Sequence, residues 1–218
     1  MNNKSFGIFN SFLLKVIAII SMLIDHVGYI FFPNEPTFRM IGRLAFPIFC
    51  FLIVEGFHHT RNHLNYLIRL SIFALLSEIP FDLAFYGKIF DLQHQNVFIT
   101  LALGLASIFC LEEMNTQRRF TIPFVLVIMA AYFSHCDYGI GGVLLICMFY
   151  LTRKTPWTRL FLCGLILYLF FGSFELYGIA AMIPITFYNG KRGPNIKMFF
   201  YWFYPVHLLI LYAIAVYL

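Results

Sequence analysis

The sequence predicts an all-α protein: a single transmembrane domain over residues 1–218, built as a polytopic membrane bundle of about nine helices with a cytoplasmic N-terminus. Of the 218 residues, 61% are hydrophobic and only 11% are charged, whereas about a quarter of the residues of a soluble domain are charged. The 28 Phe and 13 Tyr residues suit lipid-facing and interfacial positions. A mean hydropathy of +0.82 leaves no room for a separate soluble domain.

Helices are expected where apolar runs occur, and the short polar connections between the runs are typical of an antiparallel bundle. In chain order the runs cover residues 12–32, 41–57, 66–86, 96–111, 120–134, 138–151, 159–172, 176–188 and 198–217. The first run matches the roughly 20 residues that a membrane-spanning helix needs, and several later runs are shorter. Pro80 removes a backbone hydrogen bond from the third run and should bend it.

The charges between the runs predict the orientation of the bundle. With nine spans, most basic residues of the connections fall on one side: Lys4, Arg61, Arg118, Arg119, Arg153, Lys154, Lys191, Arg192 and Lys197. Basic connections stay in the cytoplasm, so we expect the N-terminus inside and the C-terminus outside. The net charge of +5 then serves orientation, and no nucleic-acid partner is expected. The five cysteines show no C-x-x-C spacing, so no metal site is expected.

Ionisable residues inside the runs are the candidate catalytic groups, because each costs roughly 2.5–3.5 kcal/mol in a membrane and such residues tend to be functional. They are Asp25, His26, Arg43, Glu78 and His207. Neighbouring residues of a helix diverge by about 100°, so Asp25 either serves the same site as His26 or pairs with Arg43. His207 follows Pro205 and is placed either in the site or against the carbonyl that this proline frees at Tyr201. A purely structural role between helices remains the alternative for each group.

A second polar layer is expected at the cytoplasmic side. It contains Glu55 and the segment from His58 to Arg61, together with a segment in which two glycines flank Lys191 and Arg192 after Asn189. Backbone N–H groups and cations of such a segment can approach a phosphate. The alternative is a turn that carries orienting positive charges.

Several motifs, in this order, resemble the TraX family. They are Met22-Leu23-Ile24-Asp25-His26, Gly42-Arg43-Leu44-Ala45-Phe46-Pro47, Glu55-Gly56-Phe57-His58-His59-Thr60-Arg61-Asn62, Ser77-Glu78-Ile79-Pro80-Phe81-Asp82, Tyr188-Asn189-Gly190-Lys191-Arg192-Gly193 and Phe203-Tyr204-Pro205-Val206-His207-Leu208. The resemblance spans nearly the whole chain. Its named member is a membrane acetylase of the N-terminal amine of conjugative pilin. The resemblance therefore implies a multi-pass protein of the bacterial cytoplasmic (inner) membrane, surrounded by lipid.

The resemblance further implies an acyltransferase that uses cytoplasmic acetyl-CoA. The CoA would bind near His58, Arg61, Asn189, Lys191 and Arg192, and its acetyl end would reach His26 or His207. An acceptor amine or hydroxyl, on a pilin subunit or a glycan, would approach from outside. A histidine suits the base, and either Arg43 or Asn96 suits the donor to the oxyanion.

Two other classes of protein remain open. Buried acids and histidines in helices interrupted by proline are also what a proton- or ion-coupled transporter needs, although no internal repeat is visible. A scaffold for membrane partners would leave the buried charges unexplained. The sequence does not identify the acceptor or the oligomeric state.

Overall fold

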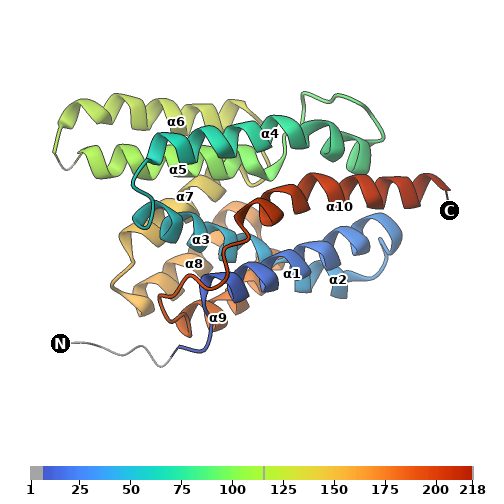
Figure 1. The fold of residues 1–218 in the computed structure, drawn as a ribbon, viewed down its shortest axis with the longest axis horizontal. Coiled ribbons are helices and arrows are strands. Elements are labelled where there is room, and N and C mark those ends of the chain that lie inside the picture. Colours follow the sequence, from blue (N-terminus) through green and yellow to red (C-terminus); the bar gives the residue numbers. More distant parts are fainter. Residues whose placement is uncertain (1–6, 115, 218) are drawn as a thin grey trace.

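The computed structural model describes residues 7–114 and 116–217, so Lys4, one of the orienting charges, lies outside the described residues. The chain folds into α-helices joined by short connections (Figure 1). They are α1 (Ser11–Phe31), α2 (Pro36–Gly42), α3 (Ala45–His58), α4 (His63–Tyr86), α5 (Val97–Met114), α6 (Thr121–Phe133), α7 (Gly139–Leu151), α8 (Pro156–Phe171), α9 (Met182–Thr186) and α10 (Lys197–Tyr217), with 3₁₀ turns η1 (Arg118–Phe120) and η2 (Ser173–Ala181). These residues contain no β-strand and only two isolated bridges. The all-α prediction is confirmed.

Each of the nine predicted runs coincides with helical structure, but two differ in detail. The second run begins earlier than expected and consists of α2 and α3, which adjoin at Arg43 and Leu44. The eighth run is the 3₁₀ turn η2 followed by the five-residue α9. Pro184 accounts for this short α-helix, because proline fits the first turn of an α-helix but not its interior.

Four segments are by themselves long and apolar enough to cross a membrane: α1, the α2–α3 segment Pro36–His58, α5 and α10. Helices α6 and α7 have 13 residues each, which corresponds to about 20 Å against a hydrocarbon thickness of about 30 Å. Large apolar side chains such as Leu75, Ile122 and Phe161 are exposed on the outside of the bundle. Apolar surface on this scale is typical of a membrane protein rather than a soluble monomer.

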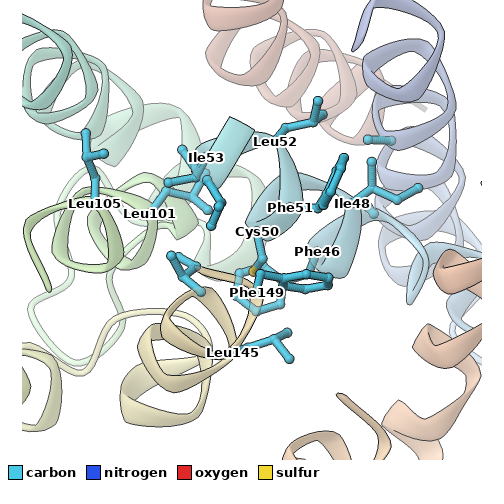
Figure 2. Packing of buried hydrophobic residues seen from close by; sticks show 14 of the residues in the cluster. Phe46, Ile48, Cys50, Phe51, Leu52, Ile53, Leu101, Leu105, Leu145 and Phe149 are labelled. Atoms are coloured by element: carbon cyan, nitrogen blue, oxygen red, sulfur yellow. The ribbon is translucent and has the colours of Figure 1, made fainter. Parts of the chain in front are cut away.

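Helix α3 lies at the centre of the bundle. In Figure 1, α4, α5 and α6 lie on one side of it, and α1, α2 and α10 lie on the other. Its sequence explains this position, since eleven of its fourteen residues are buried. Figure 2 shows Cys50 and Phe46 beside Phe149 of α7, and Ile53 beside Leu101 of α5. The packing of α3 therefore sets the relative positions of the helices around it, which carry the buried polar groups.

Two glycines allow α1 and α2 to approach closely. A Cβ atom added to Gly42 would lie 2.1 Å from Oδ1 of Asp25, and one added to Gly28 would lie 2.2 Å from Cβ of Phe38. Only hydrogen fits at these two positions, because real Cβ contacts are much longer. The close approach brings the Asp25 carboxylate to the start of α3.

Candidate functional site

A cavity of about 200 Å³ lies between the C-terminal half of α1, the junction of α2 and α3, and the loop before α7. We call it the histidine cavity. Its polar lining residues include Asp25, His26, Arg39, Arg43, Asp137 and Tyr138. Aromatic side chains, including Phe46, Phe85 and Tyr204, form much of the remaining wall. The cavity thus combines charged groups with a mostly apolar surround, as small-molecule sites do.

His26 and His207 form a hydrogen-bonded pair, although 181 positions separate them in the chain. Nδ1 of His26 lies 2.8 Å from Nε2 of His207, and the two rings are nearly parallel. Nδ1 of His207 lies 2.7 Å from the carbonyl oxygen of Phe203, which can only accept. With both rings neutral, His207 therefore donates from Nδ1 and His26 donates from Nδ1 to Nε2 of His207. This arrangement leaves Nε2 of His26 as an unprotonated nitrogen.

The same contact corrects the expectation for His207. Its partner is the carbonyl of Phe203, one turn before it, and not the carbonyl of Tyr201 that Pro205 leaves unpaired. A position four residues away on the same face of the helix is within reach of the ring, which explains the difference. Its other neighbour is His26, on α1.

The side chain of Asp25 is hydrogen-bonded to two arginines and not to His26. Its Oδ1 accepts from Nη2 of Arg43 at 2.7 Å, and its Oδ2 accepts from Nη1 of Arg39. Arg43 also donates through Nη1 to Glu175 and through Nε to the carbonyl of Arg39. The pairing of Asp25 with Arg43 confirms one of the two expectations for this residue. Arg43 is thus the centre of a buried network that joins α1, the α2–α3 junction and η2.

The loop between α6 and α7 brings two further groups to the cavity. His135 and Tyr138 have positive φ values of 49° and 64°, a conformation that non-glycine residues adopt rarely and mostly where the surroundings impose it. Gln95 imposes it here, because its backbone N–H donates to the carbonyl of His135 and its carbonyl accepts from the N–H of Asp137. The ring of Tyr138 is stacked on Phe46, which places this tyrosine in the cavity wall.

The carboxyl group of Asp137 lies among groups of both signs. Desolvation raises its pKa to about 6, and the negative charges of Glu175 and Asp25 act in the same direction against the opposing effect of Arg43. It therefore changes charge near neutral pH, unlike an ordinary aspartate. Asp137 and Tyr138 were not among the predicted catalytic residues, since the loop geometry that makes them part of the cavity leaves no signal in the sequence.

Glu78 was predicted to be catalytic, but it does not line the histidine cavity. Its carboxylate accepts from Nδ2 of Asn96, and the same amide donates to the carbonyl of Ala74. Oδ1 of Asn96 accepts from the N–H of Phe98 at the start of α5. Asn96 is therefore a buried link between α4 and α5 whose donors are already used, which makes it unsuited to bind an oxyanion.

A second and larger cavity, of about 550 Å³, lies at the opposite end of α3. We call it the arginine cavity, after Arg153 and Arg159 in its wall. Glu55, Trp157, Tyr188 and Asn189 also line it. Phe49 lines the histidine cavity and Phe51 lines this one, so the cavities lie on nearly opposite faces of α3, because residues two apart on a helix point about 200° apart.

The predicted CoA-binding residues divide into two groups. Asn189 lines the arginine cavity, whereas His58, Arg61, Lys191 and Arg192 do not. His58 is stacked on Tyr150. The side chains of Arg61, Lys191 and Arg192 are exposed.

The segment from Asn189 to Gly193 also has a structural role. Backbone carbonyls of Lys191 and Arg192 accept hydrogen bonds from the N–H groups of Ser11 and Phe12. These N–H groups at the first turn of α1 have no partner within the helix. The backbone of the segment thus caps α1, and the phosphate expected there would meet carbonyl oxygens as well as cations.

The comparison with known families identifies the chain. Residues 11–215 match the family described as "TraX protein". The chain belongs to the TraX family. The protein named "Probable fimbrial assembly protein FimC, serogroup H1", from Dichelobacter nodosus, is 34% identical, and the alignment covers 96% of this chain and 97% of that protein.

Two further relatives are more distant. "Uncharacterized protein RP591" from Rickettsia prowazekii is 24% identical over 81% of this chain and 68% of its own length. "Protein TraX" from Escherichia coli is 25% identical over 63% of this chain and 54% of its own length. No solved structure matches the chain significantly. Family membership and the four long apolar helices together indicate a membrane protein. The name of the Dichelobacter nodosus relative refers to fimbrial assembly.

Proposed function

We propose that this TraX-family protein is a multi-pass acyltransferase of the bacterial inner membrane. It would move an acetyl group from cytoplasmic acetyl-CoA to an amine or hydroxyl acceptor at the outer side, with a pilin subunit as the favoured acceptor. The name of one relative, a probable fimbrial assembly protein, supports the link to pili. The two cavities near the ends of α3 support separate sites for donor and acceptor.

The observation that carries the proposal is the free Nε2 of His26 in the wall of the histidine cavity. The unprotonated nitrogen of a neutral imidazole can accept a proton from an attacking amine or hydroxyl. His207 fixes the tautomer of His26, because its own proton is held by the carbonyl of Phe203. This is the logic by which a second group orients a catalytic base.

The reaction follows from these positions. The acceptor nitrogen or oxygen attacks the carbonyl carbon of the thioester and forms the new C–N or C–O bond. Its proton passes to Nε2 of His26, and collapse of the tetrahedral intermediate breaks the C–S bond and releases CoA as a thiolate. His26, now a cation, passes the proton to the thiolate or to solvent. Tyr138 lines the same cavity, and we assign its hydroxyl as the neutral donor for the developing oxyanion.

Arg43 has a positioning role in this proposal. Three of its donors are held by Asp25, Glu175 and the carbonyl of Arg39. Arg43 is therefore positioned to hold the walls of the cavity together rather than to stabilise the charge that develops on the oxyanion. Asp25 acts through the same network and keeps the start of α3 against α1.

The test is transfer of radiolabelled acetyl from acetyl-CoA to a pilin peptide by the purified protein in lipid nanodiscs. His26→Gln should lower the rate by about 10²–10⁴-fold, the usual contribution of a general base. His59→Gln is the matched control, because His59 is exposed and outside the histidine cavity. Transfer by His26→Gln at the wild-type rate would refute the role of His26. Absence of transfer by the wild-type protein, together with solute uptake driven by a pH gradient, would support a proton-coupled transporter instead.

A further inference from the structure

We propose that the arginine cavity binds phosphate groups of a nucleotide, through Arg159 and Arg153, with Trp157 beside the base. This inference deepens the proposed function, because the adenosine 3′,5′-bisphosphate part of CoA is a ligand of this kind. It also moves the donor site away from Arg61, Lys191 and Arg192, where the sequence had suggested it.

The charges of the cavity favour an anion. Arg153 is already paired with Glu55, at 3.4 Å between Nε and Oε1, and Glu55 also contacts His59. Within residues 7–114 and 116–217, Arg159 has no carboxylate at ion-pair distance. The cavity wall thus contains two guanidinium groups and one carboxylate. A phosphate would supply the missing negative charge.

The hydrogen bonds of Arg159 also favour an anion as the ligand of this cavity. Its Nη2 donates to the carbonyls of Thr152 and Arg153, at 3.2 and 2.6 Å, which fixes the guanidinium at the end of α7. Its Nε is buried and has no hydrogen-bond partner. A buried donor without a partner is uncommon. The planar guanidinium is also the side chain best matched to phosphate oxygens.

The aromatic residues fit the remaining part of a nucleotide. Trp157 is 82% exposed although it lines the cavity, and a base can stack on such an indole ring. Phe51 lies beneath the guanidinium of Arg159, at 5.9 Å from the ring centroid. The volume of about 550 Å³ lies within the range of roughly 300–1,000 Å³ that is usual for small-molecule sites.

The two cavities are lined by neighbouring residues of α3. The wall of the arginine cavity includes Phe51, and Phe49 belongs to the wall of the histidine cavity. Residues two apart on a helix point about 200° apart, so the two cavities lie on nearly opposite faces of α3 at this level. Lys191 and Arg192 are exposed and would attract the anion by long-range electrostatics rather than hold it.

The experiment measures binding, not acetyl transfer. Trp157 and Trp202 are the two tryptophans of the chain, so a Trp202→Phe protein reports on Trp157 alone. Adenosine 3′,5′-bisphosphate is titrated into this protein in nanodiscs of neutral lipid, and fluorescence gives the Kd. We expect saturable quenching by the bisphosphate and none by adenosine. Arg159→Gln should raise the Kd at least 10-fold, whereas Lys191→Gln should change it less than 3-fold at physiological salt.

Three results would overturn the proposal. They are an unchanged Kd in Arg159→Gln, equal binding of adenosine, and quenching that requires phosphatidylglycerol nanodiscs and ignores the nucleotide. The last would assign the cavity to a lipid headgroup. If Arg159→Gln does not fold, Arg153→Gln replaces it, because the side chain of Arg153 is half exposed. Nucleotide binding without acetyl transfer would support this site and refute the proposed function, so the two failures are distinguishable.

Discussion

Replacement of Arg43 by glutamine should be the most destabilising single change in the histidine cavity. The side chains of Arg43, Asp25 and Glu175 are 9%, 11% and 13% exposed, so both ion pairs are shielded from water. Removing one partner of a buried pair costs about 3–5 kcal/mol, because the other charge stays buried without compensation. This corresponds to a decrease of about 150- to 5,000-fold in the folded-to-unfolded ratio.

The structure also predicts which charge causes the loss. Asp25 keeps Arg39 in the Arg43→Gln variant, whereas Glu175 has no other ion-pair partner among the described residues. Adding Glu175→Gln should therefore restore much of the stability, as a double-mutant cycle would measure. Arg39→Gln is the control: its side chain is 31% exposed and Asp25 keeps Arg43, so a loss of about 1 kcal/mol or less is expected.

The assay is equilibrium unfolding in mixed micelles, monitored by circular dichroism. It is carried out on the wild-type protein, on Arg43→Gln, Arg39→Gln and Glu175→Gln, and on the double variant Arg43→Gln/Glu175→Gln. The reasoning would be refuted if Arg43→Gln and Arg39→Gln cost the same. It would also be refuted if Glu175→Gln made the Arg43→Gln protein less stable, because the uncompensated charge would then lie elsewhere.

Two further predictions concern the same cavity. The pKa of Asp137 is about 6 in the folded protein and about 3.9 in the unfolded chain, so its contribution to stability should fall as the pH rises from 4 to 6. In Asp137→Asn this decrease of the unfolding free energy with pH should disappear. An unchanged pH dependence in the variant would contradict the assignment. Gly42→Ala would place a Cβ atom 2.1 Å from the carboxylate of Asp25 and should cost about 1–3 kcal/mol. Gly164→Ala is its control, because the added atom meets only the flexible end of an isoleucine at 2.9 Å; equal thermal stabilities of the two variants would argue against a tight α1–α2 contact.

The positions of the helices could be read from the sequence, because the hydrophobic pattern is local. Every apolar run became helical, and the limits of α1 and α7 were within one residue of the prediction. The pairing of Asp25 with Arg43 was also within reach, because the 100° turn between neighbouring residues separates Asp25 from His26. The irregular segment η2 was not expected, since apolarity alone does not distinguish a 3₁₀ turn from an α-helix.

Partners between distant helices were decided only by the tertiary structure. His26 and His207 were both singled out by their cost in a membrane, but their contact depends on how α1 packs beside α10. The same holds for Glu175 at Arg43 and for Arg159 in its cavity. The physical reason is that burial selects which residues face inward, whereas packing of whole helix surfaces selects which inward-facing residues meet. The sequence by itself determined a helical membrane chain with costly polar groups, and the tertiary structure decided that these groups form two cavities near the ends of α3.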